Sequence, residues 1–183
     1  HKMIPALGWD SDSPLGCDLD AMAAAIDAQT RLIFIANPNN PTGSFLTKQA
    51  LYNFIQQVPE DVIVVLDEAY LEYSPESMRG DGSLWLSEFP NLVVTRTFSK
   101  AYGLAGLRVG YSLSHPDIAN VINRIRQPFN VNSLALKAAE AAIDDADFIQ
   151  KSMAINAKGL ELLCDCCDEL KLRYVPSKGN FLL

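Results

Sequence analysis

The chain has 183 residues, of which 49% are hydrophobic and 20% charged, a composition that excludes disordered, collagen-like and low-complexity architectures. The formal net charge is −7 and no cluster of lysine and arginine stands out, which argues against a protein that binds nucleic acid or an anionic membrane. No apolar run approaches the roughly 18 residues of a membrane span and the first residues do not resemble a signal peptide, so we expect a cytoplasmic protein with a small-molecule partner.

The first half of the chain alternates β-branched runs with an amphipathic segment. Residues 31–36 form the first clear strand, and the sequence NPNNPTG at 37–43 ends it in a loop. Apolar side chains then recur at helical spacing over residues 51–58, with Thr47 as N-cap, before residues 61–66 form a strand apolar enough to be fully buried. Strand, helix and strand in this order predict a parallel sheet.

The second half contains two further strand candidates and three helices. The strands are expected at 92–95 and 109–113, and the helices at 116–126, 132–145 and 147–170. The last residues, 181–183, look like the start of another strand that has nothing after it to pair with. We therefore expect a chain that is cut rather than finished.

Four cysteines invite a metal or redox interpretation, because Cys164 and Cys167 have CxxC spacing. A second CxxC or a nearby histidine pair, which a zinc site would need, is missing. Cys167 also falls in register with Ile149, Met153 and Leu160 on the long helix, the period of a buried stripe. We therefore expect core packing and no metal site.

Four polar features lie at the carboxyl ends of the predicted strands, where an open α/β sheet binds its ligands. They are NPTG at 40–43, DEAY at 67–70, TFSK at 97–100, and Arg108. An aspartate that ends so apolar a strand needs a cationic or hydrogen-bonding partner, although a helix cap would also explain Asp67. A lone Lys100 would usually be a solvated surface residue. Taken as a set, however, hydroxyls and a cation for a phosphate, an amine for a Schiff base and a carboxylate for a ring nitrogen indicate a pyridoxal phosphate site.

The order and spacing of these motifs closely resemble the fold type I aminotransferases of class I and II. The matching strings lie at residues 36–43, 97–111, 126–132 and 179–183, and within the family they are most similar to histidinol-phosphate aminotransferases. The resemblance implies an α/β large domain with three αβα layers and a mostly parallel sheet, incomplete at both ends. It also divides the chain: 1–146 as the central part of the pyridoxal-phosphate-binding large domain, 147–170 as the helix that links it to the small domain, and 171–183 as the start of a truncated small domain.

Carried over position by position, the resemblance implies catalytic roles for Lys100, Asp67 and Tyr70. Lys100 would form the Schiff base that holds the cofactor and later move a proton at the substrate Cα. Asp67 would pair with the pyridine nitrogen and keep it protonated. Asn40 and Tyr70 would hydrogen-bond the 3′-oxygen of the ring and stabilise its anionic form.

The resemblance further implies that Thr97, Ser99 and Arg108 bind the cofactor phosphate, the arginine through a charge-assisted contact. No role falls to His1 or His115. Family members are much longer than this chain, and their phosphate-cupping helix N-terminus, ring-stacking aromatic residue and carboxylate-binding arginine correspond to no residue here.

The implied activity is transamination between histidinol phosphate and 2-oxoglutarate in histidine biosynthesis, by a homodimeric full-length parent. Two alternatives stay open. A threonine-phosphate decarboxylase or another class I/II aminotransferase would have nearly the same cofactor residues. The 183 residues by themselves could also be a catalytically silent, truncated domain, and we expect the isolated chain to be inactive.

Overall fold

The computed structural model describes residues 1–183 and contains one four-stranded sheet, ordered β1-β2-β3-β4. The strands are β1 (Leu32–Ala36), β2 (Ile63–Asp67), β3 (Leu92–Thr97) and β4 (Gly110–Ser114). The first three strands are parallel to one another, and β4 runs antiparallel to β3. The expected mostly parallel sheet is therefore confirmed, and each strand lies within two residues of its predicted bounds.

The chain also contains five α-helices and three short 3-10 helices. The α-helices are α1 (Leu19–Ala24), α2 (Lys48–Gln57), α3 (Pro116–Ile125), α4 (Ser133–Ile143) and α5 (Ala146–Glu169). The 3-10 helices are η1 (Leu71–Tyr73), η2 (Gly82–Trp85) and η3 (Ala105–Leu107). Thr47 caps α2 as predicted, its side chain accepting a hydrogen bond from the Ala50 backbone N–H. Helix α1 was not predicted from the sequence.

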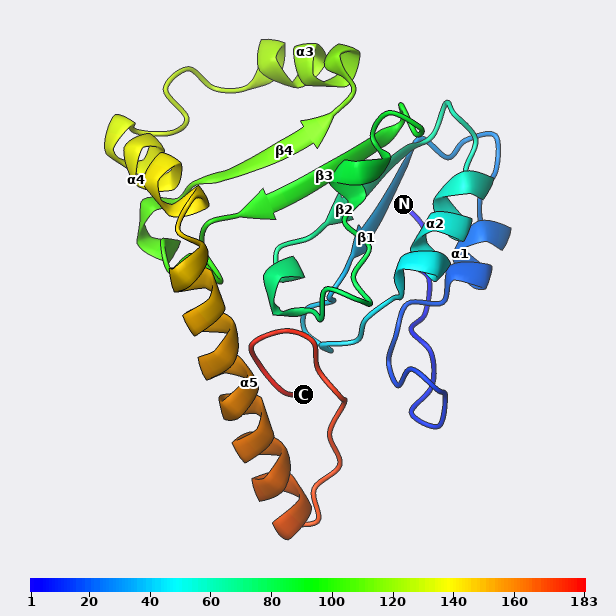
Figure 1. Ribbon diagram of the computed structural model, residues 1–183. Helices are drawn as coiled ribbons and strands as arrows, with labels where there is room; N and C mark the ends of the chain where they lie inside the picture. The colour runs from blue at the N-terminus through cyan, green and yellow to red at the C-terminus, as the bar shows by residue number, and fades with distance from the viewer.

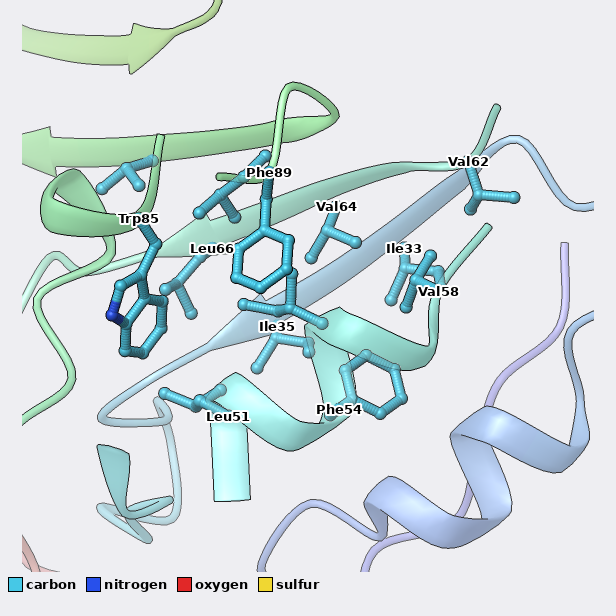
Figure 2. Close-up of a cluster of buried hydrophobic side chains, with 13 residues drawn as sticks. Ile33, Ile35, Leu51, Phe54, Val58, Val62, Val64, Leu66, Trp85 and Phe89 are labelled. Carbon is cyan, nitrogen blue, oxygen red and sulfur yellow. The ribbon is translucent and has the colours of Figure 1, made fainter. Parts of the chain in front are cut away.

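The main core lies between one face of the sheet and the helices α1 and α2, which Figure 1 shows on the same side of the strands. Side chains that alternate along the strands, such as Ile35, Leu66 and Val94, point into this core and are almost completely buried. Figure 2 shows Ile35 and Leu66 on the side of the strands that faces Leu51 and Phe54 of α2. Burial of these side chains holds the three parallel strands in register.

The opposite face of the sheet is incompletely covered. Leu32 and Phe34 alternate with the buried residues of β1 and are 54% and 69% exposed. The α/β class is thus confirmed, with a sheet whose second face lacks the helical cover of a complete three-layer domain. This agrees with the expected incompleteness.

Two expectations about the last third of the chain are wrong. Helix α5 forms, but none of its residues is fully buried, and its second half extends away from the sheet, so Leu163 and Leu170 are exposed and Cys167 is only half-buried. All four cysteines are free. Residues 181–183 form no strand; the Val175 N–H instead donates to the Leu183 carbonyl and closes residues 175–183 into a loop.

Candidate active site

The ends of the strands gather the candidate residues at one edge of the sheet. Asp67 is the last residue of β2 and Thr97 the last residue of β3, and these strands are parallel neighbours. Because β4 is antiparallel, its first residue, Gly110, pairs with Thr97 and starts at this same edge. Arg108 comes two residues before Gly110. It therefore lies close to the end of β3, although it is far from Asp67 in sequence.

The loop after β1 is fixed from inside by Asn37. Its side-chain Nδ2 donates to the Leu46 carbonyl at 3.0 Å and its Oδ1 accepts from the Leu46 N–H at 2.7 Å, so this buried amide joins the two ends of the loop. The loop presents Asn40, whose Nδ2 donates to Tyr70 Oη at 3.0 Å. The Tyr70 hydroxyl proton is left to donate to a ligand, because the hydroxyl oxygen is the acceptor in this bond.

Tyr70 also lies beside Lys100. The Lys100 Nζ lies 5.1 Å from the centroid of the Tyr70 ring, within the range of a cation–π contact. The Tyr70 side chain is buried, and the ring of Phe181 meets it edge-to-face with centroids 5.3 Å apart. Three of the residues singled out from the sequence, Asn40, Tyr70 and Lys100, are thus neighbours in space.

The turn that follows β3 brings hydroxyl groups and a guanidinium together. The Ser99 backbone N–H donates to Thr97 Oγ1 at 3.1 Å, and Arg108 Nη1 lies 3.4 Å from Ser99 Oγ and 2.9 Å from the Ala105 carbonyl oxygen. Arg108 has a left-handed backbone with φ of 54°, unusual for a residue other than glycine. The Ser99 hydroxyl beside this guanidinium, with the Thr97 hydroxyl two residues before it, forms a donor set suited to a phosphate.

Asp67 offers an exposed carboxylate at the same edge. Its Oδ1 accepts a hydrogen bond from the Ala69 N–H at 3.1 Å, which forms a local turn. The first helical residues after it belong to η1, whose N-cap is Tyr70, so the helix-cap explanation of Asp67 does not hold. Neither Asp67 nor Lys100 forms a salt bridge within the chain. Both charges are thus available to a ligand.

A buried ion-pair network behind the site was missed in the sequence analysis. Glu68 Oε2 accepts from Arg96 Nε at 2.9 Å and Nη2 at 2.7 Å, Glu68 Oε1 accepts from the Gly82 N–H at 2.7 Å, and Arg96 also pairs with Asp81. Burial raises the pKa of Glu68 to about 7, although the Gly82 N–H and Arg96 act in the opposite direction. A signal was present in the sequence: Glu68 directly follows Asp67, and Arg96 directly precedes Thr97. Pairing of β2 with β3 brings these opposite charges side by side.

The donor set fits pyridoxal phosphate. An unpaired carboxylate, a lysine amine free of salt bridges, a hydroxyl with its proton available and a phosphate-binding turn occur at one edge of the sheet. The cofactor has a ring nitrogen, an aldehyde, a ring hydroxyl and a phosphate, and each of these groups has a matching partner among these residues. No cluster of three or more His, Cys, Asp or Glu side chains is arranged to hold a metal ion, and no helix is long and apolar enough to cross a membrane.

Solved structures share this fold. The histidinol-phosphate aminotransferase from Sinorhizobium meliloti, in complex with pyridoxal-5'-phosphate, superposes with a TM-score of 0.85 at 36% identity and covers 90% of this chain and 45% of its own. The L-threonine-O-3-phosphate decarboxylase from Porphyromonas gingivalis gives a TM-score of 0.71 at 25% identity, over 85% of this chain and 48% of its own.

Curated relatives are closer in sequence. Histidinol-phosphate aminotransferase 1 of Idiomarina loihiensis is 59% identical over 98% of this chain, and histidinol-phosphate aminotransferase 2 of Pseudomonas fluorescens (strain Pf0-1) is 56% identical over 99%. Each match covers 47% of the relative, so the chain spans about half the length of the curated relatives it matches. The family model described as aminotransferase class I and II matches residues 8–183. The chain belongs to the class I and II aminotransferase family.

Proposed function

We propose that the full-length parent of this chain is a pyridoxal-phosphate-dependent aminotransferase that transfers an amino group between histidinol phosphate and 2-oxoglutarate in histidine biosynthesis. The observation that carries the proposal is the group formed by Asn40, Tyr70 and Lys100, beside Asp67 and the phosphate-binding turn. The names of relatives that are 59% and 56% identical support the choice of substrate.

Each residue has a role that its position supports. Thr97, Ser99 and Arg108 bind the phosphate, since their hydroxyls and guanidinium lie in one turn. Asp67 pairs with the protonated ring nitrogen, for which its carboxylate has no competing cation. Pyridoxal phosphate, when bound, supplies a ring that accepts the electron pair left when a bond at the substrate Cα breaks.

The remaining roles concern the ring oxygen and the proton that moves during the reaction. Asn40 holds Tyr70 Oη by its amide, so that the tyrosine hydroxyl donates to the ring oxygen. Lys100 binds the cofactor through Nζ and afterwards takes and returns the proton at the substrate Cα. Its amine lies over the Tyr70 ring, which places the proton carrier beside the group that binds the ring oxygen.

The proposal extends to the organisation of the parent protein. Residues 1–146 form the central part of the cofactor domain, 147–170 the linking helix, and 171–183 the start of the small domain. The parent is a homodimer, for which exposed apolar side chains such as Ile125, Phe129 and Leu134 offer an interface. Four free cysteines favour the reducing cytoplasm as its location. By itself the 183-residue chain is inactive.

A second candidate is a threonine-phosphate decarboxylase, supported by the TM-score of 0.71 with such an enzyme. Both activities need the same cofactor residues and differ in the Cα bond that breaks. Assays of the full-length parent separate them. Glutamate formation from histidinol phosphate and 2-oxoglutarate is expected, whereas carbon dioxide release from threonine phosphate would favour the decarboxylase.

The cofactor role of Lys100 is tested by adding pyridoxal phosphate to the full-length parent. We expect a visible absorption band that borohydride fixes covalently in the wild type, no covalent fixation in Lys100→Ala, and wild-type behaviour in Lys137→Ala, which removes an exposed lysine on α4. A wild type without the band, or fixation that survives Lys100→Ala, would refute the proposed function.

A further inference from the structure

The loop of residues 175–183 closes back onto the candidate active site. The Lys178 N–H donates to the Gly43 carbonyl at 2.9 Å, which joins the loop to the turn that presents Asn40. Asn156 of α5 donates from Nδ2 to the Gly179 carbonyl at 3.0 Å. Figure 1 shows the C-terminus returning from the far end of α5 toward the sheet. The loop is therefore attached both to the site and to the long helix.

Two glycines make this approach possible. Gly43 has φ of +74°, and a Cβ at this position would lie 2.2 Å from Ser177 Oγ. A Cβ at Gly179 would lie 2.9 Å from Cε1 of Phe181, so the aromatic ring folds back over a position that only glycine leaves open. The Gly179 N–H also donates to Ser177 Oγ at 3.0 Å. The backbone thus directs the Phe181 ring toward the site.

The folded-back ring of Phe181 meets Tyr70. Their planes make an angle of 82° with centroids 5.3 Å apart, the edge-to-face arrangement that aromatic pairs prefer. Tyr70 is held at its hydroxyl by Asn40 and faces the Lys100 amine, so Phe181 supplies a further contact to the ring itself. A tyrosine ring held in this way has little freedom to rotate its hydroxyl away.

We propose that Phe181 is a positioning residue of the active site. Its ring fixes the orientation of Tyr70, so that Tyr70 Oη is presented together with Asn40 to the ring oxygen of pyridoxal phosphate, and the Tyr70 ring stays beneath Lys100 Nζ. Phe181 acts through Tyr70. This inference rests on the proposed function.

The test is a pH titration of the visible absorption of pyridoxal phosphate bound to the full-length parent. The Tyr70 hydrogen bond stabilises the anionic ring oxygen and lowers the pH midpoint of the absorption change. Loss of this bond in Tyr70→Phe is expected to raise the midpoint by about one pH unit. Phe181→Ala is expected to raise the midpoint by a large part of that shift. Phe181→Tyr keeps the aromatic ring and is expected to have the midpoint of the wild type.

Two further variants separate positioning from folding. Phe181→Leu keeps an apolar side chain without an aromatic edge, and we expect it to remain folded and still show a raised midpoint. Met3→Ala, a substitution at a side chain that is 85% exposed and lies outside the proposed site and interface, should leave the midpoint unchanged. In the double variant of Phe181→Ala with Tyr70→Phe, the shift should not exceed that of Tyr70→Phe alone, because both changes remove the same hydrogen bond.

The outcomes are distinguishable. A wild type with the visible band whose midpoint stays unchanged in Phe181→Ala and Phe181→Leu overturns the inference and leaves the proposed function intact. A full additional shift in the double variant also overturns it, because Phe181 would then act independently of Tyr70. A wild type that binds no pyridoxal phosphate refutes the proposed function, and the inference falls with it.

Discussion

The unfolding free energy of Glu68→Gln should increase relative to that of the wild type as the pH rises. The carboxyl group of Glu68 is 1% exposed, and burial raises its pKa from an ordinary 4.5 to about 7. The folded state therefore keeps this proton to a higher pH than the unfolded state does. The resulting contribution to stability is complete below about pH 4.5 and is lost as the pH rises through about 7.

The size of the effect follows from the gap between these two values. At about 1.4 kcal/mol per pKa unit, the gap corresponds to a change of about 3 kcal/mol in the unfolding free energy of the wild type relative to Glu68→Gln. Asp81 also titrates: burial acts to raise its pKa, but hydrogen bonds from Ser83 and the charge of Arg96 lower it overall. This residue is present in both proteins, so its contribution largely cancels in the difference.

Denaturant unfolding of the full-length apoprotein at pH values from 5 to 8 measures the difference. Glu76→Gln is the matched control, because Glu76 is 89% exposed and pairs only with nearby Arg79. We expect the unfolding free energy of Glu68→Gln minus that of the wild type to increase steadily with pH, and the control difference to stay flat. A Glu68→Gln difference that is constant or decreases with pH would refute the reasoning.

Two further predictions concern the elements that support the site. Leu66→Ala, at a completely buried position of β2, should lower the unfolding free energy by about 2–5 kcal/mol because it leaves a cavity in the main core, and a loss below 1 kcal/mol would contradict the packing described here. Asn132→Ala should cost about 1 kcal/mol, because Asn132 Oδ1 caps α4 by accepting from the Ala135 N–H. Asn132→Asp, which keeps a capping oxygen, should have the denaturation midpoint of the wild type, and an unchanged midpoint in Asn132→Ala would show that the cap contributes nothing.

Strand positions were predictable because burial selects for an apolar pattern that is visible in one dimension. Residues 62–66 are apolar throughout, and the structure places β2 within two residues of the predicted range 61–66. The direction of β4 was not predictable, since the sequence does not show which neighbour a strand pairs with. Residues 181–183 have the composition of a strand, but their backbone takes part in a loop closed by the Val175–Leu183 hydrogen bond.

The candidate site was predictable as a set of motifs but not as a set of contacts. The edge rule for parallel sheets explains why Asp67 and Thr97 lie together, and the family resemblance gave each residue an expected role. The contact of Phe181 with Tyr70 joins residues more than 100 positions apart and depends on two glycines that allow close backbone approach. The buried Glu68 was overlooked because its charge suggests exposure, and its burial is tolerable because Arg96 on the next strand and the Gly82 N–H both bond its carboxyl group.

Antiparallel β4 has a consequence for how the site can vary. The segment between β3 and β4 leaves and re-enters the sheet at one edge, so Ser99, Lys100 and Arg108 are carried as one unit. That unit is anchored at both ends: Phe98 and Val109 pack against Ala135 and Ala139 of α4, and the Phe98 N–H donates to the Val109 carbonyl. Two small side chains of α4 thus support the base of the turn that carries the lysine and the arginine, and a larger side chain at Ala135 or Ala139 is expected to displace that base.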